Sequence, residues 1–252
     1  MVGSDGGVFG FGDAGFVGSL PGIGVHVSNI VGMVSTADGR GYWMVGSDGG
    51  VFGFGDAGFV GSLPGIGVHV SNIVALVPTA DGRGYWMVGS DGGVFGFGDA
   101  GFVGSLPGIG VHVSNIVAMV PTPDGKGYWM VGSDGGVFGF GDAGFVGSLP
   151  GIGVHVSNIV ALVSTSDGKG YWMVGSDGGV FGFGDAGFVG SLPSIGVHVS
   201  NIVGMVPTSD GKGYWMVGSD GGVFGFGDAV FVGSLPGIGV HVSNIVALVP
   251  TR

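Results

Sequence analysis

The chain has 252 residues, of which 45% are hydrophobic and 9% charged, and its 17 aspartates outweigh six lysines and arginines to give a formal net charge of −11. Such an acidic chain lacks the basic surface that nucleic-acid phosphates require, and no apolar run reaches the roughly 18–20 residues of a membrane helix. The absence of cysteine excludes disulfides and thiolate metal sites, and the opening MVGSDGG lacks the basic and apolar regions of a signal peptide.

Glycine accounts for 64 residues, but 18 Phe, 5 Trp and 5 Tyr lie between the glycines at fixed positions. Disordered chains are poor in aromatic residues, and collagen requires a Gly-X-Y period that is absent here. No apolar stripe follows the 3.6-residue period of a helix. The sequence therefore predicts an ordered, all-β protein.

One unit of 43 residues repeats along the whole chain. Copies begin at Met1, Met44, Met87, Met130, Met173 and Met216, and the last copy is truncated at Arg252. A period in the low forties with several short strands per unit is typical of β-propeller blades.

Each unit divides at its turn signals into four predicted strands. In chain order these are NIVGMVST (29–36), YWMVGS (42–47), GVFGFGDA (50–57) and FVGSL (59–63), separated by ADGRG, SDGG and Asp-Ala-Gly turns. Phe52 and Phe54 share one face of the third strand, and we expect the glycines opposite them to let a neighbouring sheet approach. The link LPGIGVHVSN then leads to the next blade.

The two ends of the chain are complementary, since it begins inside a second strand and ends after a first strand. We therefore expect residues 244–251 to pair with residues 1–20 and to close a single domain, 1–252, as a six-bladed β-propeller of near-identical four-stranded blades. The closing blade lacks the Tyr-Trp pair, which makes it the predicted weak point. A linear β-solenoid and an open stack of hairpins are alternatives. We expect a monomer, with blade-swapped oligomers as the alternative if another blade number packs better.

The segment GYWMVGSDGGVFGFGDAGFVGS resembles a glycine-rich bacterial repeat of the form GYWLV-SDGGVF-FGDA-F-GS, which occurs in tandem arrays of exported and surface-associated proteins. It is more loosely similar to propellers of the NHL and YVTN classes. The resemblance implies a propeller that acts as a binding or display module, with an extracellular or cell-surface location, and it supplies no catalytic residues.

One histidine per copy and one aspartate in each SDGG turn are predicted to lie on one face of the ring. We considered an axial metal or anion site, but zinc takes about four ligands, and we favour histidines that bond the local backbone. The candidate residues are His26, His69, His112, His155, His198, His241, Asp5, Asp48, Asp91, Asp134, Asp177 and Asp220.

Two further aspartate series, which begin at Asp13 and Asp38, are expected in turns on the opposite face, where they bond backbone amides. SDGG is too short for an EF-hand, and no lysine follows the glycines to bind phosphate. No cofactor is expected.

Tryptophan follows tyrosine in five copies. Such aromatics could stack on sugars between blades, with multivalency from the repeats, but a tryptophan in a strand flanked by apolar residues favours core packing. The candidates are Trp43, Trp86, Trp129, Trp172 and Trp215.

No nucleophile, base and orienting group converge asymmetrically, because Ser, His and Asp recur in every copy. The sequence predicts a non-enzymatic structural or binding module for a protein or glycan ligand. The alternatives are a multivalent lectin-like propeller and a metal-dependent hydrolase or lyase with an axial site.

Overall fold

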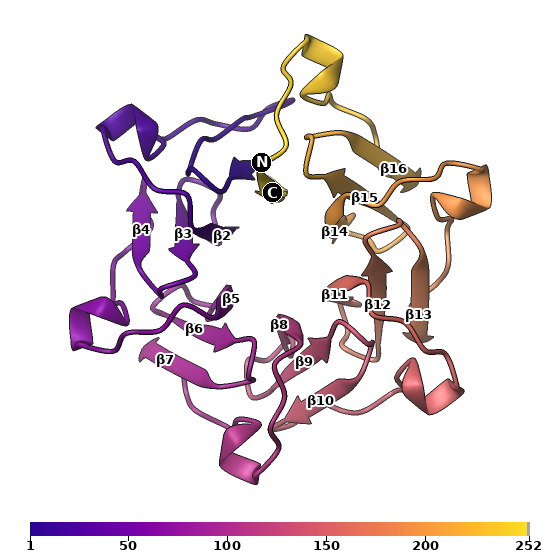
Figure 1. Ribbon diagram of the computed structural model, residues 1–252, viewed down its shortest axis with the longest axis horizontal. Helices are drawn as coiled ribbons and strands as arrows, with labels where there is room; N and C mark the ends of the chain where they lie inside the picture. The colour runs from indigo at the N-terminus through magenta and orange to yellow at the C-terminus, as the bar shows by residue number, and fades with distance from the viewer. Residues whose placement is uncertain (251–252) are drawn as a thin grey trace. The chain divides into compact units, whose positions relative to one another are not determined.

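The computed structural model describes residues 1–250, which form short β-strands and 3-10 turns (Figure 1). No helix among these residues has the length and apolar character needed to cross a bilayer. The prediction of an all-β protein made of repeated units is confirmed.

Five of the sheets are built from a first, a second and a third strand of the repeating pattern, and a sixth first strand, β17, pairs with β1. The first strands are β2 (Ile30–Ser35), β5 (Ile73–Pro78), β8 (Ile116–Pro121), β11 (Ile159–Ser164), β14 (Ile202–Pro207) and β17 (Ile245–Ala247). The second strands are β3 (Tyr42–Gly46), β6 (Gly84–Gly89), β9 (Tyr128–Gly132), β12 (Gly170–Gly175) and β15 (Gly213–Gly218). The third strands are β4 (Val51–Phe54), β7 (Val94–Gly98), β10 (Val137–Phe140), β13 (Val180–Gly184) and β16 (Val223–Gly227). The short strand β1 is Val2–Gly3.

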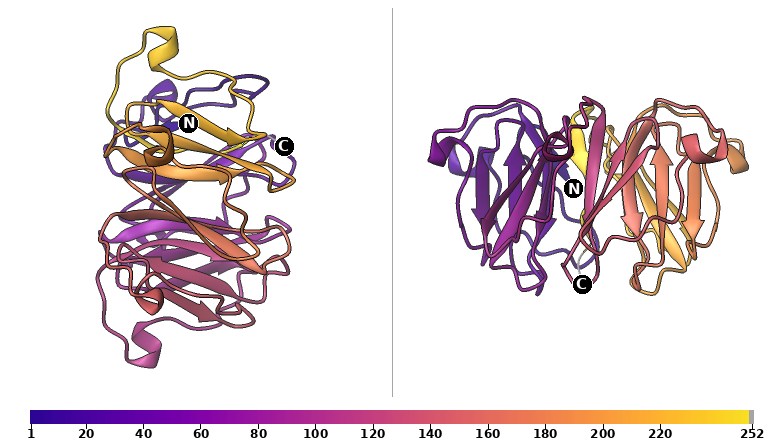
Figure 2. Two further views of the ribbon diagram at one scale, coloured as in Figure 1. Left: turned by 90° about the vertical axis from the view of Figure 1, so that its right-hand side faces the viewer. Right: turned by 90° about the horizontal axis from the view of Figure 1, so that it is seen from below.

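These strands form antiparallel sheets, with the second strand between the first and the third. In the sheet β2-β3-β4, Val34 lies opposite Trp43 and Phe52 lies opposite Met44. The turn between β3 and β4 is tight, since the Gly46 N–H donates to the Gly50 carbonyl at 2.9 Å and Gly49 has a φ of 75°. At the other end of the sheet, the turn between β2 and β3 is closed by the Thr36 N–H, which donates to the Gly41 carbonyl at 2.9 Å. Figure 2 shows the connections between strands at the ends of the sheets.

The predicted fourth strand is wrong. Among the described residues, five sheets have three strands and the sheet β1-β17 has two, and the FVGSL segments have no strand structure. The indole N–H of Trp43 donates to the Gly58 carbonyl, but the hydroxyl of Tyr85, on the next sheet, donates to the Gly61 carbonyl. The segment therefore crosses from one sheet to the next and does not pair with β4.

The expected role of the glycine between the two phenylalanines is also wrong. Gly53 is exposed, and a Cβ there would lie 2.5 Å from the Ala57 carbonyl oxygen of the same repeat. The glycine that receives an aromatic ring is Gly61, where a Cβ would lie 2.5 Å from the ring of Phe97. The neighbouring sheet therefore approaches closely at residues 58–63, which we call the crossing segment, and not at the third strand.

The chain divides into two compact units. The first comprises residues from Met1 to Ser114 with the C-terminal residues from Asn244, and the second comprises Asn115–Ser243. Within the first unit the first strands β17, β2 and β5 lie side by side, and within the second unit so do β8, β11 and β14.

The core of each unit lies between neighbouring sheets. In the first unit one buried cluster contains Trp43, Leu63, Ile73 and Tyr85. The ring centroids of Trp43 and Tyr85 are 6.2 Å apart. In the second unit Trp172 and Tyr214 repeat this contact at 6.3 Å. The tryptophan of one repeat therefore packs against the tyrosine of the next.

The predicted pairing of the two ends of the chain is confirmed. Strand β17 is antiparallel to β1, with Val2 opposite Ala247 and Gly3 opposite Ile245. Val2 and Ile245 are buried. This contact lies within the first unit, where β17 also packs beside β2.

Candidate binding surface

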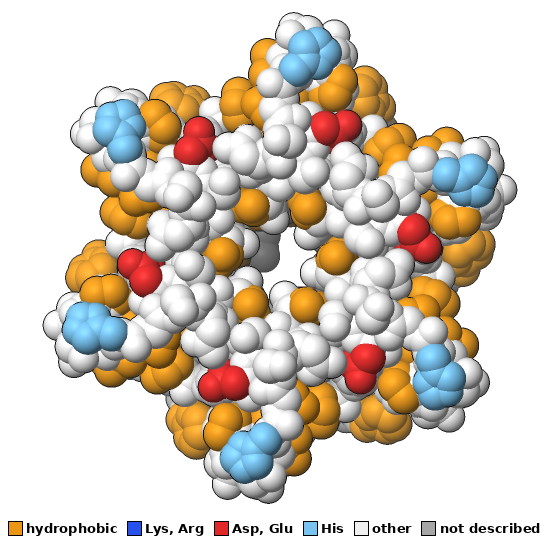
Figure 3. Space-filling model, in the orientation of Figure 1, with side chains coloured by type: hydrophobic (Ala, Val, Ile, Leu, Met, Phe, Trp, Pro, Cys, Tyr) orange, Lys and Arg blue, Asp and Glu red, His pale blue; other side chains and the backbone are white. Residues whose placement is uncertain are grey.

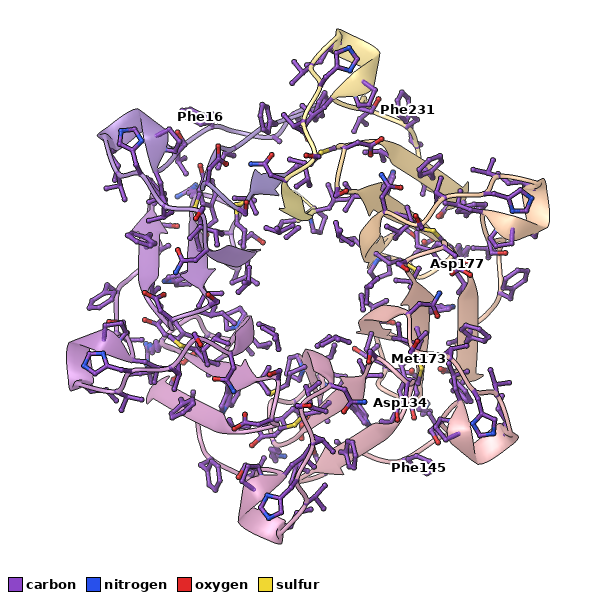
Figure 4. The ribbon with its side chains drawn as sticks, viewed as in Figure 1. Phe16, Asp134, Phe145, Met173, Asp177 and Phe231 are labelled. Atoms are coloured by element: carbon purple, nitrogen blue, oxygen red, sulfur yellow. The ribbon has the colours of Figure 1, made fainter. Side chains whose placement is uncertain are left out.

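An exposed Phe-Val pair occurs in each repeat and, in five of the six, follows a third strand. The phenylalanines are 59–64% exposed, which is unusual for so large an apolar side chain: Phe16, Phe59, Phe102, Phe145, Phe188 and Phe231. In Figure 4 the labelled Phe145 lies beyond the outer edge of the sheet that contains β10. The set recurs in every repeat, and sequence reasoning missed it because FVGSL was assigned to a pairing strand.

Two side-chain hydrogen bonds hold this segment from opposite sides. Trp43 Nε1 donates to the Gly58 carbonyl at 2.8 Å, and the Tyr85 hydroxyl donates to the Gly61 carbonyl. Phe59 lies between these two anchored glycines and is 63% exposed. The backbone that presents the ring is therefore fixed although the ring faces solvent.

A second apolar group lies at the 3-10 turn of each link, as in η2 (Pro64–Ile66). The Ser62 hydroxyl accepts the Gly65 N–H at 3.2 Å, and Gly67 ends the turn with a φ of 75°. Ile66 is 61% exposed. The corresponding turns are η1 (Pro21–Ile23), η3 (Pro107–Ile109), η4 (Pro150–Ile152), η5 (Pro193–Ile195) and η6 (Pro236–Ile238).

The sixth repeat exposes more apolar surface than the others. Val230 replaces the glycine found at Gly15 and is 69% exposed, and Val232 is 56% exposed where the other copies give 36–39%. A Cβ at Gly15 would meet nothing within 4 Å. The substitution to valine is therefore accommodated without a clash.

The six histidines are exposed and lie in the links after the 3-10 turns. Figure 3 shows the histidine side chains at the surface of the face in view. In the described part of the chain no imidazole has a hydrogen bond to the protein, so the expected bond to the local backbone is wrong. No group of three or more histidines and aspartates within residues 1–250 could hold a metal ion.

The aspartates of the SDGG turns cap their own turns. Asp48 Oδ1 accepts the Gly50 N–H at 3.0 Å, and Asp134 and Asp177 make the same contact with Gly136 and Gly179. In each unit these aspartates lie on the face that carries the histidines, where no lysine or arginine is visible (Figures 3 and 4). The capping of these turns accounts for the aspartate in each SDGG segment, and no bound ligand is needed to explain it.

The two other aspartate series meet at a threonine that sequence reasoning overlooked. The Thr36 hydroxyl lies 3.0 Å from both Asp38 Oδ1 and Asp56 Oδ1, and it accepts the Gly41 N–H. The two turns therefore lie at the same end of the sheet, as predicted. The sequence feature that could have indicated this contact is the threonine that recurs at the same place of the repeat. Its copies are Thr79, Thr122, Thr165 and Thr208.

A basic residue pairs with one aspartate at this end. Lys126 Nζ lies 2.9 Å from Asp124 Oδ2, whereas Arg40 Nε lies 3.7 Å from Asp38 Oδ2. The Lys126 ammonium holds the pKa of Asp124 well below its usual range, and the Arg40 backbone N–H lowers the pKa of Asp38. These carboxylates are ionised at neutral pH and stabilise their own turns.

The tryptophans lie in the core and are not placed for stacking on sugars. Trp43, Trp86, Trp129 and Trp172 are 2–3% exposed, and their indole N–H groups donate to backbone carbonyls of the crossing segments. Trp215 is half-buried and bonds the Val230 carbonyl at 2.8 Å.

No family model and no curated protein sequence matches this chain. Solved structures do resemble it. Sqt1 of Chaetomium thermophilum, bound to the N-terminus of the ribosomal protein L10, has a TM-score of 0.55 and 15% identity over 79% of this chain and 59% of its own. The Cps50 (Swd1) β-propeller domain of Myceliophteria thermophila has a TM-score of 0.52 and 14% identity over 79% and 65%.

Both neighbours are WD40-type propellers. The chain is built from β-propeller blades. At this identity the likeness shows the fold alone, and the chain spans about three-fifths of the length of these neighbours. The number of blades in a closed ring stays a prediction.

Proposed function

We propose that these propeller blades form a non-enzymatic binding module whose ligand is another protein. The observation that carries the proposal is the fixed, exposed phenylalanine of each repeat. Aromatic side chains dominate protein–protein contacts, and a backbone fixed before binding reduces the entropy lost on association. Sqt1, which has a similar fold, binds an N-terminal protein segment.

Neither alternative function has a supporting observation. The tryptophans proposed for sugar stacking do not form a sugar-binding surface, because four of the five are buried. A metal-dependent hydrolase or lyase needs converging ligands, and no such group occurs within residues 1–250. The repeat resemblance further supports the proposal that the module is exported or surface-associated, which protease treatment of intact producing cells would test.

The experiment is a selection of displayed peptides on the folded protein, in parallel with a glycan panel. The selected peptides are then measured against a variant with serine in place of Phe16, Phe59, Phe102, Phe145, Phe188 and Phe231. We expect the circular dichroism spectrum to be retained and the affinity to fall about tenfold or more, the loss typical of an aromatic anchor.

The matched control replaces the six exposed isoleucines, from Ile23 to Ile238, with serine. Equal affinity of the phenylalanine variant and the parent for every selected peptide would contradict the assignment of the surface. Binding of glycans without any selected peptide would contradict the proposed function itself.

A further inference from the structure

The third strand of each three-stranded sheet has one free edge. In the sheet β2-β3-β4, strand β4 pairs with β3 alone. The first strand β2, at the other end of the sheet, lies beside β5 of the next sheet. The same holds in the second unit, where β11 lies beside β14 and β13 ends its sheet.

The hydrogen-bond pattern identifies the free groups. Because Gly46 bonds Gly50 across the turn, the alternation of an antiparallel ladder directs the N–H and C=O of Phe52 and Phe54 toward β3. The N–H and C=O of Val51 and Gly53 then point away from the sheet. Among the described residues these four groups have no hydrogen-bond partner.

Strand β4 itself carries no charged residue and no proline. Natural sheets block edges with charges, prolines, bulges or a covering segment, but Val51–Phe54 reads VFGF. The following residues cross to the next sheet through the bonds at Gly58 and Gly61. Gly53 is exposed, but the Ala57 carbonyl oxygen occupies the space that a side chain would take. A partner backbone can therefore reach Gly53 along the strand edge and not over that face of the sheet.

The charges around the edge select the chemistry of the occupant. Asp48 precedes the strand and Asp56 follows it, and both are exposed. The nearby Arg40 is paired with Asp38, so both ends of the edge stay negative. In an antiparallel pair of two such edges, the aspartates of one copy would lie near those of the other. Charge therefore disfavours a second copy of this chain and favours a cationic segment.

We propose that each free third-strand edge takes up an extended, lysine- or arginine-rich segment of a partner protein as a fourth strand. The edges are those of β4, β7, β10, β13 and β16. The partner's backbone bonds Val51 and Gly53, and its basic residues lie near Asp48 and Asp56. This inference rests on the proposed function and assigns it a site distinct from the exposed phenylalanines.

The probe is an acetylated, amidated peptide of alternating lysine and valine, and the readout is amide hydrogen exchange with affinity measured by calorimetry. We expect the peptide to slow exchange at Val51, Gly53 and their equivalents, and its affinity to fall as salt is added. A peptide with glutamate in place of lysine should bind about tenfold more weakly or worse.

The test variant carries proline at Val51, Val94, Val137, Val180 and Val223. Proline is tolerated where a strand N–H faces outward, because no ladder bond is lost. We expect about tenfold weaker peptide binding because one of the two outward donors of each edge is gone. The serine variant of the six exposed isoleucines, from Ile23 to Ile238, serves as control and should bind this peptide as the parent does.

Unchanged exchange at Val51 and Gly53 of the parent protein would overturn the proposal, whether or not the proline variant folds. So would equal binding by the folded proline variant, or no binding of the lysine peptide at all. If the peptides selected for the proposed function still bind and depend on the phenylalanines, that function stands without the edge site.

Discussion

At the scale of single residues, the tyrosine of each second strand joins a buried ring to a hydroxyl that bonds the crossing segment. Burial raises the pKa of Tyr42, Tyr85, Tyr171 and Tyr214 above the ordinary value, although their bonds to backbone carbonyls act in the opposite direction. A phenol pKa that is higher in the folded than in the unfolded chain adds to the free energy of unfolding at any pH below the pKa of the unfolded chain, about 10. This contribution is lost as the pH rises through the pKa of the folded chain.

We therefore expect these tyrosines to ionise only above the pH at which the unfolded chain ionises, together with loss of the fold. The measurement is tyrosinate absorbance against pH for the native protein and for the protein in denaturant. Native and denatured curves that coincide, with circular dichroism unchanged, would contradict the burial of the phenols.

Trp215 differs from the other tryptophans in its burial. It is half-buried, whereas the other four are 2–3% exposed. We expect acrylamide to quench one minor component of the tryptophan fluorescence, and Trp215→Phe to remove that component. Trp43→Phe, which changes a buried tryptophan, should leave it in place.

At the scale of the structural element, the crossing segment depends on one glycine and not on its neighbour. Gly61 has a φ of 140°, and a Cβ there would lie 2.5 Å from the ring of Phe97, whereas a Cβ at Gly58 would meet nothing within 4 Å. We expect Gly61→Ala to lower the free energy of unfolding by about 1–3 kcal/mol through strain and overpacking.

Gly58→Ala is the matched control and should change the free energy of unfolding by less than about 0.5 kcal/mol. Val230 already occupies the corresponding place in the sixth repeat. Denaturant titration of both variants measures the difference. Equal stabilities would mean that the crossing segment does not pack against Phe97.

At the scale of the whole molecule, the contact between the ends of the chain joins residues far apart in sequence. Ile245 is 1% exposed and its strand pairs with β1. We expect Ile245→Ala to cost about 2–5 kcal/mol, as for other buried isoleucines. Ile23→Ala, at a side chain that is 62% exposed, should be close to neutral.

Native mass spectrometry tests the predicted closed monomer at the same scale. A species of 24.7 kDa is expected for the single chain. Dimers or larger species at low protein concentration would instead favour exchange of blades between chains.

The sequence by itself determined the all-β class, the 43-residue unit, three of its strands and the pairing of the two ends. These features follow from local turn chemistry and from a repeat whose two ends are complementary, so they need no knowledge of neighbouring sheets. The burial of the tryptophans also followed from their apolar neighbours.

Only the tertiary structure decided the course of FVGSL. An apolar five-residue run predicts a strand, but the indole of Trp43 and the hydroxyl of Tyr85 bind its carbonyls from two different sheets. Those contacts join residues of different strands and repeats, which no local pattern encodes. Because they draw the segment away from β4, they expose both the phenylalanine of each repeat and the edge of each third strand.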